Sequence, residues 1–130
     1  MSHFSRIKTN ITDLETLQQT LKDLKFEYNI NKPHLKDANG NLEYVDLVAT
    51  QKHTKDIIGF LWNGKEYTFI SDFELWQNHY KLNPNILIEK ILQQYSINSI
   101  IKTTSKEGFN TVKKLQLKDG SIKLIAQRWN

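Results

Sequence analysis

Residues 56–71 read DIIGFLWNGKEYTFIS, and this stretch decides the fold. Apolar residues alternate on both sides of Asn63-Gly64, a dipeptide that favours a two-residue β-hairpin turn because both of its positions accept positive φ. A loop of this length predicts three cross-strand pairs: Trp62 with Lys65, Phe60 with Tyr67, and Ile58 with Phe69. One face of the hairpin is then an aromatic and aliphatic block, which we expect to lie in the core.

A helix is predicted on each side of this hairpin. Thr12-Asp13-Leu14-Glu15 fits a capping box with Thr12 as the cap, and leucines at helical spacing follow over residues 13–24. Asn83 as cap and Pro84 as first helical residue predict a second helix over residues 85–95. The apolar stripe of the second helix consists of Ile88, Ile91, Leu92 and Tyr95.

The remaining segments predict strands and one long loop. Period-two patterns indicate strands at about 3–9, 26–30, 44–51, 97–103, 109–118 and 121–129. Residues 31–41, NKPHLKDANGN, are rich in turn-forming residues, so we expect a surface loop there.

The order of these elements predicts an α+β fold. We expect a mostly antiparallel sheet with two helices packed on one face, arranged as ferredoxin-like split β-α-β units plus extra hairpins. No Pro-, Gly- or Ser-rich linker divides the chain, so residues 1–130 are expected to form a single domain.

Composition indicates a soluble protein without a membrane span. The 130 residues are 38% hydrophobic and 25% charged, no apolar run approaches the ~20 residues of a spanning helix, and the N-terminus lacks a secretory signal pattern. The absence of cysteine excludes disulfides, thiolate metal sites and a cysteine nucleophile. The net charge of +4 comes almost entirely from lysine and fits either a solvated lysine surface or attraction to polyanions.

No motif predicts a cofactor, a metal site or a known catalytic mechanism. The glycines are scattered and form no phosphate-binding loop, and the four histidines have no metal-ligand spacing. The segment SDFELWQNHY, residues 71–80, places Asp72, Glu74 and His79 close together, and such groups could serve as general acid and base. The alternative is a polar connection anchored to the core by Phe73 and Trp76.

The C-terminal sequence KKLQLKDGSIKLIAQRWN predicts a second hairpin around Asp119-Gly120. A two-residue turn would pair Lys118 with Ser121, Leu117 with Ile122, and Leu115 with Leu124, with a buried face formed by Leu115, Leu117, Ile122, Leu124 and Ala126. The opposite face would carry Lys114, Lys118, Lys123 and Trp129. Lysines beside an exposed aromatic could bind single-stranded nucleic acid, or Trp129 could simply cover Val112 and Ile125.

Both ends of the chain resemble a known family. SHFSRIKTNITDLETL, residues 2–17, and DGSIKLIAQRW, residues 119–129, are similar to the hypothetical chloroplast frame thirty-five family of algal plastids and cyanobacteria. The resemblance implies a plastid-encoded chloroplast protein, in the stroma, without a transit peptide. It implies no activity and no catalytic or ligand residues.

Three functions follow as hypotheses. The first is a non-enzymatic protein-binding or assembly factor that uses exposed strand edges. The alternative is a weak single-stranded RNA- or DNA-binding protein that uses Lys114, Lys118, Lys123 and Trp129. The third is an unrecognised enzyme around residues 72–79.

Overall fold

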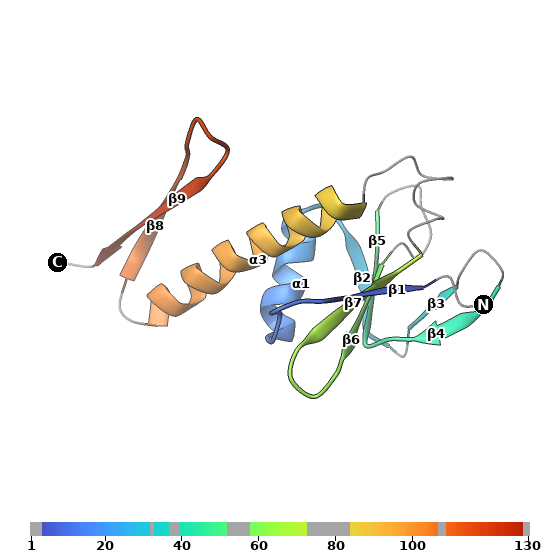
Figure 1. The fold of residues 1–130 in the computed structure, drawn as a ribbon. Helices are drawn as coiled ribbons and strands as arrows, with labels where there is room; N and C mark the ends of the chain where they lie inside the picture. The colour runs from blue at the N-terminus through green and yellow to red at the C-terminus, as the bar shows by residue number, and fades with distance from the viewer. Residues whose placement is uncertain are drawn as a thin grey trace.

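A five-stranded antiparallel sheet forms the centre of the protein (Figure 1). A computed structural model describes residues 4–31, 33–36, 40–51, 58–72, 84–106 and 109–128. The strand order is β1-β7-β6-β5-β2, and every neighbouring pair is antiparallel. The strands are β1 (Ser5–Lys8), β2 (Glu27–Asn29), β5 (Leu47–Thr50), β6 (Ile58–Trp62) and β7 (Tyr67–Ser71).

The predicted central hairpin is formed by β6 and β7, but its predicted register is wrong by two residues. Trp62 pairs with Tyr67, and Phe60 pairs with Phe69. The turn is longer than predicted because the Asn63 side chain accepts hydrogen bonds from the backbone N–H groups of residues 65 and 66, which closes a four-residue loop. A shift of two keeps every side chain on its predicted face, so the aromatic block still enters the core.

Helices α1 (Leu14–Asp23) and α3 (Pro84–Lys106) pack against one face of this sheet. Their buried side chains meet those of alternate sheet residues in a single core, which includes Leu17, Leu21, Phe60, Phe69, Ile88, Ile91 and Tyr95. The predicted α+β class, the mostly antiparallel sheet and the two helices on one face are confirmed. Pro84 begins α3 as predicted, whereas Asn83 lies outside the described residues.

Helix α3 is far longer than predicted, and the predicted strand over residues 97–103 is wrong because this segment is helical. Ile97 is also buried, but on the side of the helix opposite to the stripe of Ile88, Ile91 and Tyr95, where it lines a groove toward β9. The hydroxyl of Thr104 donates to the carbonyl of Ile100, which accommodates a hydroxyl side chain within a helix. Burial of Ile97 and the hydrogen bond from Lys102 to Asp13 outweigh the β-propensity of the isoleucines.

A small hairpin of β3 (His34–Lys36) and β4 (Leu42–Tyr44) covers the other face of the sheet. Leu35 is buried there with Val45, Val48 and Ile70. Gly59 of β6 gives Leu35 its space, because a Cβ at position 59 would lie 2.7 Å from Leu35 Cδ1. The loop predicted over residues 31–41 is therefore partly a strand that completes a second, smaller core.

The last two strands, β8 (Phe109–Gln116) and β9 (Ile122–Arg128), pair only with each other in the described structure. They form a hairpin at the far end of α3, away from the five-stranded sheet (Figure 1). The predicted second β-α-β unit, around the helix at 85–95, lacks its second strand, because residues 97–103 belong to α3 and β8 pairs with β9 instead. The ferredoxin-like detail is therefore not confirmed.

The register of this terminal hairpin differs by one residue from the prediction. Gln116 pairs with Ile122 and Lys114 with Leu124, across a three-residue loop in which Gly120 has a φ of +88°. Asp119 fixes this loop by accepting a hydrogen bond from the backbone N–H of Ser121 at 2.9 Å. A shift of one exchanges the faces of one strand relative to the other, so the predicted apolar face is not formed, and Leu117 is 46% exposed.

Candidate functional site

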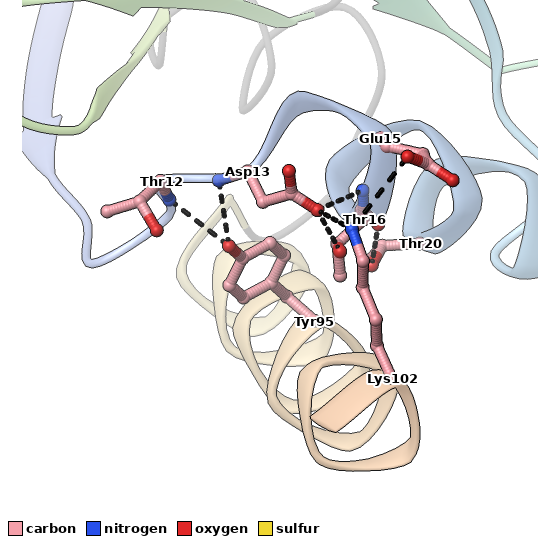
Figure 2. Close-up of polar contacts among 7 residues, drawn as sticks. All are labelled: Thr12, Asp13, Glu15, Thr16, Thr20, Tyr95 and Lys102. Atoms are coloured by element: carbon pink, nitrogen blue, oxygen red, sulfur yellow. Dashed lines mark hydrogen bonds and ion pairs between the residues drawn. The ribbon is translucent and has the colours of Figure 1, made fainter. Parts of the chain in front are cut away.

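A polar cluster joins the N-terminus of α1 to α3 (Figure 2). Asp13 is the N-cap of α1, and its Oδ2 accepts hydrogen bonds from the backbone N–H of Thr16 at 3.1 Å and from the Thr16 hydroxyl. Lys102 Nζ, from the second half of α3, donates to the same oxygen at 2.8 Å and lies 3.8 Å from Glu15 Oε2. One carboxylate therefore caps α1 and ties it to α3.

Tyr95 of α3 is the remaining member of the cluster. Its ring is buried, and its hydroxyl oxygen accepts the backbone N–H groups of Thr12 and Asp13, each at 3.1 Å (Figure 2). The predicted cap at Thr12 is wrong by one residue, because Tyr95 satisfies the Thr12 backbone and the helix begins after Asp13. The tyrosine thus orients the chain as it enters α1.

The charges in this cluster stabilise one another. The hydrogen bond from Lys102, and then that from Thr16, hold the pKa of Asp13 below its ordinary value of 3.8, although desolvation opposes this change. The hydrogen bond to Asp13 in turn raises the pKa of Lys102 above its ordinary value of 10.5. Near neutral pH the carboxylate is ionised and the amine is protonated, so Lys102 is not prepared to act as a nucleophile or base.

A groove of about 230 Å³ runs beside this ion pair, between α1 and α3. Below it, Asn98 donates hydrogen bonds to Thr20 Oγ1 at 3.1 Å and to Asp23 Oδ2 at 3.0 Å. Among the side chains that the structure describes, no buried polar atom lacks a partner and no cluster has the ligands for a metal ion. The polar groups of the groove therefore serve the packing of α1 against α3.

The predicted acid-base segment is only partly described. Asp72 is buried directly after β7, whereas Glu74 and His79 lie outside the described residues. The enzyme hypothesis therefore stays a prediction.

The residues predicted for the nucleic-acid surface are placed by the terminal hairpin. Lys118 lies in the loop and Lys123 in β9, and both side chains are exposed. Lys114 lies in β8 opposite Leu124, while Trp129 falls outside the described residues. Because Lys123 is opposite residue 115, positions 114 and 123 belong to opposite faces of the ribbon rather than to the single face predicted.

A second groove, of about 560 Å³, separates α3 from the terminal hairpin. Its apolar lining consists of Ile97 and Ile100 from α3 and of Ile122 and Leu124 from β9. Ile100 is 45% exposed and its neighbour Ile101 is 41% exposed. We call residues 97–106 of α3 together with the terminal hairpin, residues 109–128, the C-terminal arm.

The C-terminal arm also concentrates the charge of the protein. Residues 109–128 contain five basic side chains and one acidic side chain, giving a formal charge of +4. This value equals the net charge of all 130 residues, so the rest of the chain is neutral. The acidic residue, Asp119, is bound to Ser121 within the loop.

Two features of the C-terminal arm were not predicted from the sequence. Ile100 and Ile101 are assigned to a strand by their β-branched side chains, and the apolar spacing of Ile88, Ile91 and Tyr95 does not continue into this segment to indicate a helix. The charge asymmetry is visible in the sequence once charges are counted by segment rather than over the whole chain.

Comparison with known proteins finds relatives of full length. A family described as "Protein of unknown function (DUF1257)" matches residues 20–125. The chain is 40% identical over 130 residues to "Uncharacterized protein ycf35" of Pyropia yezoensis, covering 100% of this chain and 99% of the relative. It is 36% identical over 129 residues to the protein of the same name from Guillardia theta, covering 99% and 98%.

A third relative is similar to the chain over nearly its whole length. The protein of the same name from Cyanophora paradoxa is 33% identical over 129 residues, covering 99% of this chain and 98% of the relative. These relatives are encoded in plastid genomes, which confirms the predicted plastid location. No solved structure matches the chain. None of the helices within the described residues combines the length and apolar character needed to cross a membrane.

Proposed function

This chain belongs to the ycf35 family of plastid proteins, and from that premise we propose that it is a non-enzymatic protein-binding or assembly factor. The observation that carries the proposal is the C-terminal arm. It extends from the helix-covered sheet (Figure 1) and carries Ile100, Ile101 and Leu117, each more than 40% exposed. Ile100 also lines the groove toward β9, and exposed apolar side chains beside a groove are typical of protein-interaction surfaces.

The chemistry of the α1–α3 cluster supports a non-enzymatic role. Asp13 uses one carboxylate oxygen for a helix cap and for Lys102, and Tyr95 uses its hydroxyl to bind two backbone groups. Side chains that are committed to packing in this way are poorly suited to exchange protons with a substrate. We place the action of the protein in the stroma, consistent with the plastid coding of the family.

Site-specific photocrosslinking tests the proposal. A benzoylphenylalanine is placed at position 100 or 117 of the full chain, and the protein is irradiated in plastid extract. The control position is Tyr44, which is 70% exposed on β4, away from the C-terminal arm. Positions 100 and 117 should give the same protein adduct, and position 44 should not. Adducts that are identical at all three positions, or absent at positions 100 and 117, would contradict the proposal.

A second candidate function is weak binding of single-stranded RNA or DNA by Lys114, Lys118, Lys123 and Trp129. The exposure of Lys118 and Lys123 on a segment with a charge of +4 favours it. The test is a titration with a labelled oligonucleotide at two salt concentrations. Binding should weaken with salt and on Trp129→Ala, and binding unaffected by both would exclude this function.

A further inference from the structure

The groove between α3 and the terminal hairpin has an apolar floor and a basic surrounding. Ile97, Ile100, Ile122 and Leu124 provide the floor. Position 114 is opposite the groove residue Leu124 in the register, and Lys118 lies in the hairpin loop, three residues before the groove residue Ser121, which binds Asp119. Among the described residues, no acidic side chain lines this groove.

We infer that this groove binds an acidic amphipathic segment of a partner protein, an inference that rests on the protein-binding function proposed above. The apolar side of the segment would contact Ile97, Ile100 and Ile122, and its carboxylates would face the basic hairpin. A segment of this kind satisfies both features of the groove, because burial of apolar surface supplies affinity and charge complementarity supplies orientation and a faster association rate.

Charge argues against a second copy of this chain as the occupant. Two terminal hairpins would bring formal charges of +4 together, and the remainder of each chain is neutral overall. Of the acidic residues near the helix junction, Asp13 is already paired with Lys102. A self-association through this surface would therefore be opposed by repulsion between like charges.

The groove also suits a protein better than a nucleic acid. Its described lining consists of aliphatic and small polar side chains and contains no aromatic residue on which a base could stack. Arg128 is the one arginine among residues 109–128, whereas base recognition favours the bidentate guanidinium group.

Fluorescence anisotropy with a designed peptide tests this inference on the full chain. The probe is a labelled 18-residue peptide of leucine and glutamate, with the leucines at helical spacing on one face. A peptide of the same composition, with its leucines distributed around the helix, is the reference. The amphipathic peptide should bind about tenfold more tightly than the reference at 50 mM salt, and its affinity should fall at 300 mM salt.

Two matched pairs of charge-reversal substitutions distinguish the effect of charge near the groove from the effect of a changed net charge. Lys114→Glu with Lys118→Glu should weaken binding of the amphipathic peptide by about tenfold or more, because two attractive charges become repulsive. Lys65→Glu with Lys90→Glu changes the charge equally at exposed sites outside the C-terminal arm and should leave binding within about twofold. Ile100→Ser, at a half-exposed position, should weaken binding through the groove. Circular dichroism checks that each variant is folded.

Other results would overturn the inference. They are equal binding of the two peptides, equal effects of the two charge-reversal variants, or tighter binding of a 12-residue oligouridylate or of phosphatidylglycerol vesicles than of the peptide. If photocrosslinking at positions 100 and 117 still captured a specific protein, the protein-binding function would stand and only the acidic chemistry of the partner would be wrong.

Discussion

Asp13 shows how one side chain can organise the junction of two helices. Its carboxylate is both the cap of α1 and the partner of Lys102 on α3. We expect Asp13→Ala to lower the free energy of unfolding by about 1 kcal/mol, the usual value of an N-cap, as measured by urea denaturation at pH 7. Glu89→Ala, which removes an exposed carboxylate from α3, is the control and should have a smaller effect. Equal effects of the two substitutions would contradict the role of Asp13.

The same carboxylate should make stability depend on pH in the acid range. The pKa of Asp13 is lower in the folded protein than its ordinary value of 3.8, so its contribution is present above that value and is lost as the pH falls through the folded pKa. Asp13→Asn should therefore reduce the loss of stability between about pH 5 and pH 2. Unfolding measured across this range should give a flatter curve for Asp13→Asn than for Glu89→Gln.

Gly59 sets the distance between the sheet and the β3–β4 hairpin. A Cβ at this position would lie 2.7 Å from Leu35 Cδ1 and 3.0 Å from Val45 Cγ1. Gly59→Ala should therefore destabilise the protein by about 1–3 kcal/mol through overpacking. In the Gly59→Ala background, Leu35→Ala should cost less than it does in the wild type, because it makes room for the added methyl group. Additive free energies of unfolding would contradict this packing.

At the scale of elements, the two hairpins explain which structural details were predictable. Both turns were predicted as two-residue loops, yet Asn63 and Asp119 each use their side chains to bind backbone N–H groups further along, which lengthens the loops. The central hairpin shifts by two residues and keeps its faces, so its core side was predicted correctly. The terminal hairpin shifts by one, so its predicted cross-strand pairs, and the apolar face that followed from them, were wrong.

Helix α3 shows why local propensity failed over residues 97–103. Four β-branched residues in this segment favour a strand, but Ile97 is buried beside the groove toward β9 and Lys102 reaches Asp13. These contacts join residues far apart in the sequence, and a local pattern does not report them. For the candidate site, the lysines of the hairpin were found from the sequence, whereas the groove beside Ile100 depends on the helical conformation.

The continuity of α3 can be tested with proline. Position 101 is exposed, so Ile101→Pro acts mainly on the backbone, where it removes a helical hydrogen bond. We expect a loss of about 3 kcal/mol in stability and of helical circular dichroism at 222 nm. Ile101→Ala is the control and should retain the helical signal. If both variants kept the wild-type spectrum, a continuous helix through residue 101 would be contradicted.

In the whole molecule, the buried cores that stabilise the fold and the proposed binding surface lie in different parts of the chain. The two buried cores draw their described residues from positions up to Tyr95, and none of residues 116–125 is buried. A chain that ends at residue 106 should therefore still unfold cooperatively in urea and keep the near-ultraviolet circular dichroism of its packed aromatic residues. Loss of cooperative unfolding would show that the terminal hairpin is required for the core.

The net charge is also distributed unevenly, with the positive charge in the terminal hairpin. The rest of the chain is neutral overall, whereas residues 109–128 have a charge of +4. Partner binding can then be altered by charge changes in the hairpin without disturbing the buried cores. In the proposed interaction, this basic hairpin and the apolar side of α3 together bind an acidic amphipathic segment.

Chemical-shift mapping tests that claim most directly. The leucine-glutamate peptide is added to the nitrogen-15-labelled full chain, and the backbone amide signals are followed by nuclear magnetic resonance. We predict concentration-dependent shifts concentrated in residues 93–100 and 114–124, with the amides of β1 and β2 unchanged. Shifts confined to the edges of the five-stranded sheet, or no shifts at a saturating concentration of peptide, would contradict the account.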